Sequence, residues 1–190
     1  MNRLRMGQRG ATTIEMTFVG IPLIFILISV FEMSRGMWNY HTLAYAAKIG
    51  VRYSIVHGIN CDPNSGSLNT CTTSIAAIAT QIQNASVGID PSRTELTFTP
   101  GSTSSTSTSC YMGTPIASPP YGALSGACSG ITGTWPPSDG NGTYNGVGRQ
   151  IEIDIRTPFS SALGMFWPGS KPVSFALVNL GATSQDRIQF

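Results

Sequence analysis

The sequence predicts an α+β protein with a long N-terminal helix, a second short helix and a small antiparallel sheet. Three observations predict it. A mostly apolar run at 12–31 continues into a helical pattern that reaches residue 57. Apolar residues at helical spacing recur over 73–86, and strict apolar-polar alternation at 150–156 indicates a strand. Helices that pack on such strands make a two-layer α+β domain.

The first part of the N-terminal helix is predicted to cross a membrane. Residues 12–31 span the ~30 Å hydrocarbon core at about 1.5 Å per residue. Pro22 lies inside this run, where it removes a backbone hydrogen bond and is expected to kink the helix. Arg3, Arg5 and Arg9 precede the run. By the positive-inside rule the N-terminus stays in the cytoplasm and the chain after the run is exported.

Composition supports export and argues against a nucleic-acid partner. Charged residues make up 11% of the chain and hydrophobic residues 41%, which is typical of an exported or loop-rich protein. The formal charge is +2. The three arginines before the apolar run account for this excess, so the rest of the chain has no basic face for nucleic acid.

The helical pattern continues beyond the membrane as a seam of apolar and small residues at 4-3 spacing. Ala46 and Gly50 add small side chains that permit close packing. The seam could pack on the protein's own domain or on other subunits, and a long helix can do both, with its membrane half meeting neighbours. The seam residues are Met33, Met37, Tyr40, Ala44, Ala47, Val51 and Ser54.

The exported domain is expected to cover 58–190, because Gly58 ends the helical pattern. Alternation of apolar and polar residues favours strands, and Gly, Pro and Ser mark loops. The segment 101–146 is rich in Ser, Thr and Gly and is predicted to be a long insertion with aromatic anchors. The predicted elements are a helix at 73–86 and strands at 94–99, 150–156 and 173–178.

All four cysteines lie on the exported side, which favours disulfides. They are Cys61, Cys71, Cys110 and Cys128. Three pairings are open, and sequential pairing, 61 with 71 and 110 with 128, is favoured over the others and over unpaired thiols. A zinc site is not expected, because no close C-x-x-C pair is present and His41 and His57 fall on the predicted helix.

No motif of a known catalytic chemistry is present, so the chain is not expected to be an enzyme or to use a cofactor. The segment 139–143 could offer oxygens to calcium at alternate positions. It lacks the glycine at the sixth position of an EF-hand loop and the distal glutamate, so a plain turn is favoured. Glu32 and Arg35, one helical turn apart at the outer membrane surface, are expected to form a solvated ion pair.

Glu15 is a charge at the edge of the apolar run, and no other charge follows until Glu32. A charged side chain at the centre of a membrane helix costs on the order of 2.5 kcal/mol or more, so such groups lie at the interface or meet a partner. Thr12-x-x-Glu15 also fits a capping box, in which the two residues satisfy backbone N–H groups at a helix start. Gly10, five residues before the glutamate, and the basic residues before it favour a special role.

This combination resembles the type IV pilin-like proteins, and more closely the TadE-type pseudopilins of bacterial tight-adherence (Tad, Flp) systems. The resemblance covers about residues 8–57. The residues that carry it are Arg9–Leu23, Phe31–Gly36 and Ala46–Tyr53.

The resemblance implies that residues 1–10 are a leader, which a prepilin peptidase removes by cutting between Gly10 and Ala11. Glu15 would then pair with the N-terminal amine of a neighbouring subunit, which offsets the cost of an unpaired buried carboxylate. The other implied partners are pilin or pseudopilin subunits, which contact the N-terminal helix, an inner-membrane assembly platform and the lipid bilayer. The domain would be periplasmic or extracellular, or incorporated into a pilus.

The chain is longer than the family usually is, so the resemblance favours a minor component that initiates, caps or assembles a Tad/Flp pilus or secretion pseudopilus. The alternative is a signal-anchored envelope binding or adhesion protein. Its anchors would be aromatic residues of the insertion, Tyr111, Tyr121, Trp135 and Tyr144. A third hypothesis, signal-peptidase cleavage near 34–36, would discard the seam that follows.

Overall fold

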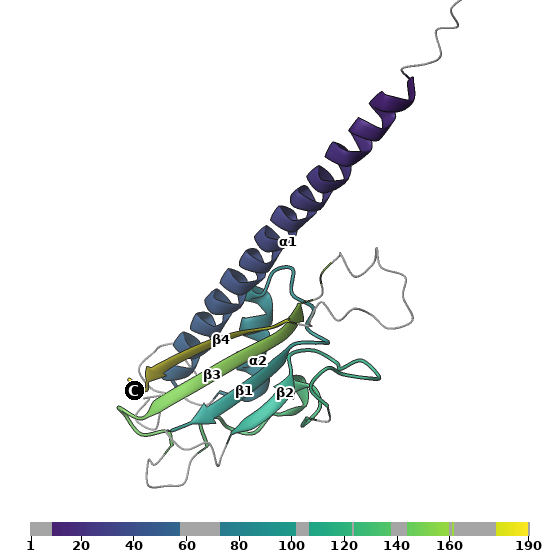
Figure 1. The fold of residues 1–190 in the computed structure, drawn as a ribbon. Helices are drawn as coiled ribbons and strands as arrows, with labels where there is room; N and C mark the ends of the chain where they lie inside the picture. Colours follow the sequence, from purple (N-terminus) through teal and green to yellow (C-terminus); the bar gives the residue numbers. More distant parts are fainter. Residues whose placement is uncertain are drawn as a thin grey trace, which may run out of the picture.

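The computed structural model describes residues 9–57, 73–101, 107–122, 124–137, 144–159, 161 and 178–189, with side chains from Ile14 onward. It contains a long helix, a short helix and a four-stranded antiparallel sheet (Figure 1). The α+β arrangement predicted from the sequence is therefore confirmed.

Helix α1 runs from Arg9 to Ile55 and is 47 residues long, about 70 Å at the usual rise. Its N-terminal half stands clear of the domain, whereas its C-terminal half lies along the sheet (Figure 1). The helix continues through Pro22 without interruption. The loss of one backbone hydrogen bond at this position therefore does not end the helix.

The sheet has the order β2-β1-β3-β4, and every neighbouring pair is antiparallel. Its strands are β1 Glu95–Pro100, β2 Thr108–Tyr111, β3 Gln150–Phe159 and β4 Val178–Arg187. Strands β1 and β3 confirm the predictions at 94–99 and 150–156. Strand β3 extends further than predicted, through Pro158. Its pairing with β1 ends at Arg156, so the N–H that Pro158 lacks is not needed for that pairing.

The other two strands differ from expectation. The predicted strand at 173–178 lies outside the described residues except for Val178, where β4 begins. Strand β2 lies inside the predicted insertion, where the sequence predicts no strand. It pairs with β1 through Leu96 opposite Cys110 and Thr97 opposite Ser109, so part of the insertion belongs to the sheet.

Helices α1 and α2 cover one face of the sheet, and the core lies between these two layers. Helix α2 runs from Ile75 to Ala85, and the hydroxyl of its N-cap residue Ser74 accepts a hydrogen bond from the Ala77 N–H at 3.2 Å. The predicted stripe of α2 is buried. The core side chains include Leu43, Ala47, Val51, Ile75, Ile78, Ala79, Ile82, Leu96, Phe98, Ile151, Ile153 and Ile155.

Gly50 is where α1 approaches α2 and the sheet most closely. A Cβ at this position would lie 2.7 Å from Cδ1 and Cγ1 of Ile82 and 3.2 Å from Cδ1 of Ile153. We expect Gly50→Val to lower the free energy of unfolding by about 1–3 kcal/mol, because overpacking outweighs any gain in helix propensity. Thermal unfolding of the full chain in detergent, followed by circular dichroism, measures this.

The control is Gly133→Val, since a Cβ at Gly133 meets no heavy atom within 4 Å. Equal melting temperatures for the two variants would show that α1 does not pack tightly at Gly50.

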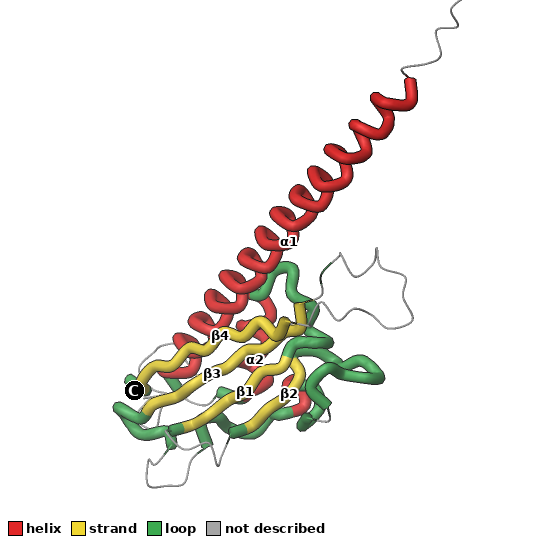
Figure 2. Tube along the Cα trace, in the orientation of Figure 1, coloured by secondary structure: helices red, strands yellow, loops and turns green. Residues whose placement is uncertain are grey.

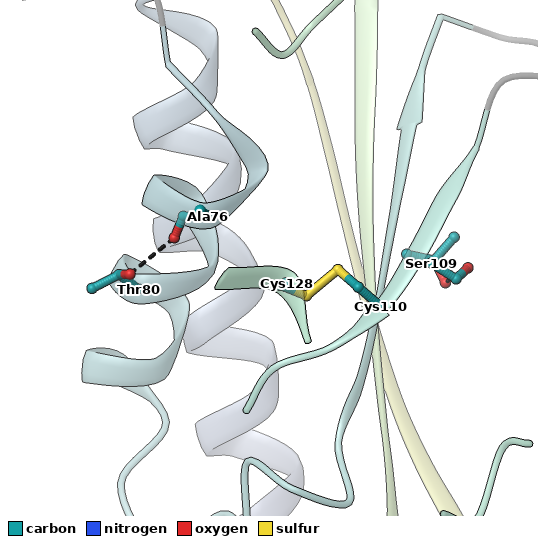
Figure 3. The surroundings of a disulfide bond; sticks show 6 residues. Ala76, Thr80, Ser109, Cys110 and Cys128 are labelled. Carbon is teal, nitrogen blue, oxygen red and sulfur yellow. Dashed lines mark hydrogen bonds between the residues drawn. A yellow bond between two sulfur atoms is a disulfide. The ribbon is translucent and has the colours of Figure 1, made fainter. Parts of the chain in front are cut away.

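A disulfide closes a loop within the predicted insertion, between β2 and the segment that follows it. Cys110 of β2 and Cys128 of the 3-10 helix η2, Cys128–Gly130, are joined with an S–S distance of 2.07 Å (Figure 3). This is one of the two pairs favoured from the sequence, and the other cysteines, 61 and 71, lie outside the described residues. Trp135 adds an edge-to-face contact with Phe98, ring centroids 5.5 Å apart.

Candidate functional site

The N-terminal half of α1 presents apolar side chains outward on all sides. They are 51–77% exposed and include Ile14, Met16, Phe18, Val19, Ile21, Leu23, Ile24, Phe25, Ile26, Leu27, Val30 and Phe31. In Figure 2 the tube of this half stands clear of the described part of the domain. By length and composition, α1 is the one helix of the described chain that could cross a membrane. A bilayer would cover this exposed apolar surface.

Glu15 is exposed within this apolar surface, next to Ile14 and Met16. No ion pair with Glu15 is found among the described side chains. Gly10 and Ala11 lie in the first turn of α1. Because residues four apart are neighbours on a helix surface, Glu15 lies about one helical turn from Ala11, on the C-terminal side.

The capping-box alternative for Glu15 does not fit the uncut chain. Helix α1 begins at Arg9, so Thr12 already lies inside the helix and cannot serve as its N-cap. A cut after Gly10 would leave Ala11 as the first residue, with Thr12 and Glu15 in the first helical turns.

The seam beyond the membrane is divided between two environments. Met33, Met37 and Tyr40 are exposed by 75, 63 and 47%, whereas Val51 and Ser54 are buried against the domain. The outer part of the seam therefore packs on the protein's own sheet and α2. The inner part is exposed in the described chain, so packing on the protein's own domain accounts for only the outer part of the seam.

Glu32 and Arg35 are not the solvated pair expected from the sequence. Glu32 is only 8% exposed, and its Oε1 lies 3.6 Å from Nη1 of Arg35. The Arg35 guanidinium lies 4.8 Å from the ring centroid of Phe159, at the end of β3. Glu32 is buried while Arg35 stays partly exposed, and the Arg35–Phe159 contact brings the end of β3 to α1, two distant parts of the sequence. The domain thus begins to pack on α1 about one turn beyond the predicted span.

A cavity of about 390 Å³ opens beside this contact. Three segments form it: α1 at 35–39, the loop after α2 at 88–93 and the end of β3 at 157–159. Its polar lining includes Arg35, Arg93, Asp90 and Asn39, and its aromatic lining comprises Trp38 and Phe159. Among its lining, Arg35, Trp38 and Asn39 lie on α1 a short distance beyond the predicted span.

Comparison with known families concerns the same helix. The family model of TadE-like proteins matches residues 10–52. The N-terminal helix is TadE-like. The match runs from the last residue of the predicted leader through the exposed apolar half and most of the packed half of α1. No curated protein and no solved structure matches the chain.

The domain carried by the TadE-like helix gives little support to the aromatic anchors of the adhesion alternative. Tyr111 and Trp135 are 1% and 4% exposed, so these two side chains serve the core and cannot contact a partner. Tyr111 belongs to β2, a strand that the sequence did not predict, and Trp135 packs on Phe98. Tyr121 and Tyr144 are half-buried.

A buried carboxylate lies on the sheet at Glu95, which is 8% exposed and pairs in register with Arg156. Burial raises the pKa of Glu95 above 4.5; Arg156 opposes this shift and the Asp154 carboxylate adds to it. Burial and the charge of Glu95 also raise the pKa of Tyr121 to about 12. The sequence offers no sign that Glu95 is buried, because alternation places Leu96 and Phe98 in the core instead.

We expect the contribution of Glu95 to stability to be greatest below pH 4.5 and to be lost as the pH rises through its raised pKa, because the folded state holds the proton more tightly. Glu95→Gln should therefore gain in melting temperature relative to the wild type as the pH goes from 4 to 7. Arg156 retains a partner in the variant, Asp154, at 2.7 Å.

Thermal unfolding at both pH values tests this, with Glu152→Gln as the control for loss of a half-buried carboxylate on β3. Parallel pH profiles for Glu95→Gln and the wild type would contradict the expected result.

In the described part of the chain, no group of three His, Cys, Asp or Glu side chains could hold a metal ion. Of the residues considered for metal binding, His41 is exposed on α1 and His57 is buried just after it, with Nδ1 2.6 Å from the Tyr53 carbonyl oxygen. The segment 139–143 lies outside the described residues.

Proposed function

We propose that this protein is a minor pseudopilin that helps initiate, cap or assemble a Tad/Flp pilus or a related secretion pseudopilus. The observation that carries the proposal is the TadE-like helix, whose exposed apolar half is long enough to span a membrane. TadE-like proteins are associated with the Tad pilus and are structural components. The role proposed for this chain is likewise non-catalytic.

Processing at the leader is the first step of the proposed role. A prepilin peptidase cuts the peptide bond between Gly10 and Ala11, which removes residues 1–10. A glycine before this bond lets the backbone enter a narrow peptidase site, since it has no side chain to exclude. The product carries a positive amine on Ala11 at the end of its apolar helix.

Assembly is the second step. Glu15 is the only charge that the described part of α1 presents among its exposed apolar residues from Ile14 to Phe31. In a neighbouring subunit the new amine of Ala11 offers the opposite charge. Their pairing offsets the cost of each charge alone in an apolar environment and favours one longitudinal register between helices.

The surface that meets other subunits follows from the burial of α1. The protein's own domain already covers α1 at Leu43, Ala47 and Gly50. Contacts with pilin or pseudopilin subunits and with the inner-membrane platform therefore fall on the apolar half and on the exposed inner seam at Met33 and Met37. The chain would be anchored in the bacterial inner membrane with its N-terminus cytoplasmic and its domain periplasmic.

A deletion strain complemented with the full chain tests this function against the adhesion alternative. If the protein assembles the filament, the deletion removes surface filaments, counted by electron microscopy, and complementation restores them. If it is an anchored adhesin, filaments remain at wild-type numbers and only attachment is lost, which would contradict the proposal.

A further inference from the structure

The cavity between α1, the loop after α2 and the end of β3 lies where a membrane surface would be. In Figure 2 the loop after α2 lies beside α1 at the point where the helix leaves the domain. Arg35 and Trp38 follow the predicted end of the span, residue 31, by four and seven residues. At about 1.5 Å per residue they lie about 6–10 Å beyond the hydrocarbon, within or just outside the headgroup layer.

Trp38 supports this depth independently of the span. Its side chain is 63% exposed although it lines the cavity. Tryptophan is enriched where hydrocarbon meets the headgroups, because its ring is apolar and its N–H can donate a hydrogen bond. The cavity mouth therefore has the character of a membrane interface.

One residue of the cavity lining carries a donor without an acceptor. Arg93 lines the cavity, and its Nε is buried and has no hydrogen-bond partner in the structure. A buried N–H of a guanidinium calls for an acceptor, and phosphate oxygens suit the fork of an arginine. Arg35 supplies a second guanidinium, which also faces the Glu32 carboxylate at 3.6 Å and the ring of Phe159.

One acid balances these two cations within the lining. Oδ1 of Asp90 accepts hydrogen bonds from the backbone N–H of Ser92 at 3.0 Å and from its hydroxyl at 2.7 Å, and the side chain remains exposed. These bonds fix the loop that carries both Asp90 and Arg93. A ligand with a phosphate and an ammonium group would match this combination of charges.

We propose that the cavity binds the phosphodiester of a phospholipid headgroup, with phosphoethanolamine preferred because Asp90 can accept from its ammonium. Arg93 and Arg35 would hold the phosphate, and Trp38 would lie beside the glycerol. Such a contact fixes the height and tilt of the domain on the outer leaflet while the subunit waits for assembly. The inference rests on the membrane topology of the proposed function.

Titration of the full chain in detergent micelles with short-chain lipids tests this, with binding followed by phosphorus NMR. Dihexanoyl phosphatidylethanolamine should bind, and Arg93→Gln should weaken its binding about tenfold or more, since a charge-assisted hydrogen bond is lost. Arg149→Gln removes the same charge from an exposed loop arginine and should leave binding unchanged. Arg93→Lys, which keeps the charge but lacks Nε, should also bind more weakly.

Asp90→Asn adds a test of the headgroup. The amide retains an oxygen for Ser92, so the loop is preserved while the negative charge is lost. We expect the preference for phosphatidylethanolamine over phosphatidylglycerol to disappear or reverse. Circular dichroism of each variant verifies that it is folded.

Three results would overturn the inference: no lipid binding, equal binding by Arg93→Gln and Arg149→Gln, or inorganic phosphate binding as tightly as the lipid. The last would make the cavity a site for free phosphate. The proposed function has a separate readout, because it predicts that the chain in cells resists alkaline carbonate extraction and supports filaments. If those hold and lipid binding fails, only the inference is wrong.

Discussion

Glu15→Ala should leave leader removal and membrane insertion intact and abolish incorporation of the protein into the assembly. The variant lacks the only charge among the exposed apolar residues of the span, so insertion becomes easier. In the assembly, however, the amine of a neighbouring Ala11 is left unpaired. Breaking a buried pair by removing one partner costs about 3–5 kcal/mol, which lowers incorporation about 100-fold or more at 1.4 kcal/mol per tenfold.

Immunoblots of sheared filaments and of the membrane fraction measure this effect. Glu15→Gln is the informative companion, because it retains size and polarity but lacks the charge, and it should also fail to assemble. Thr17→Ala is the control on the same exposed half of α1. Wild-type amounts of Glu15→Ala in filaments would show that the glutamate has no role in assembly.

Gly10→Val should block leader removal almost completely. A β-branched side chain immediately before the scissile bond restricts the backbone and fills space that a glycine leaves free. The precursor should accumulate in the membrane, because the span 12–31 is unchanged, and no mature form should enter the filament. Gel mobility of the membrane-bound protein, compared with the wild type, measures the processed fraction.

Gly20→Val is the matched control, since it makes the same substitution in the same helix where a Cβ meets no heavy atom within 4 Å. Its processing should equal that of the wild type. Full processing of Gly10→Val would contradict a cut after Gly10 that requires a glycine at this position.

The long helix could be predicted from the sequence because its signal is local. A mostly apolar run of twenty residues at 12–31 and a seam at 4-3 spacing are both properties of neighbouring positions. The same holds for α2 and for β3, whose isoleucines alternate strictly with polar residues. The TadE-like match ends at residue 52. Beyond it, the fold of the domain could be predicted only from these patterns.

Strands β2 and β4 could not be predicted because their signals depend on distant partners. Strand β2 lies beside a Ser/Thr tract and becomes a strand by pairing with β1. In β4 only Ala182 is buried, so no alternation of apolar residues marks the strand. Edge strands of this kind take their register from the central strands.

The cavity beside α1 could not be predicted from the sequence for the same reason. Arg35 and Phe159 are far apart in the sequence, and only the return of β3 to α1 brings them together. The sequence indicates a charge pair at Glu32 and Arg35 but not its burial. In contrast, Gly10, Ala11 and Glu15 are candidate sites through their resemblance to the start of pilin-like proteins, which depends on positions close together along one helix.

The most direct test of the proposed function is the N-terminal sequence of the membrane-bound and filament-bound protein, in cells with and without the prepilin peptidase. The proposed function predicts Ala11 as the first residue in the presence of the peptidase and an uncut leader in its absence. Met1 retained in the filament, or a first residue beyond the span, would contradict it.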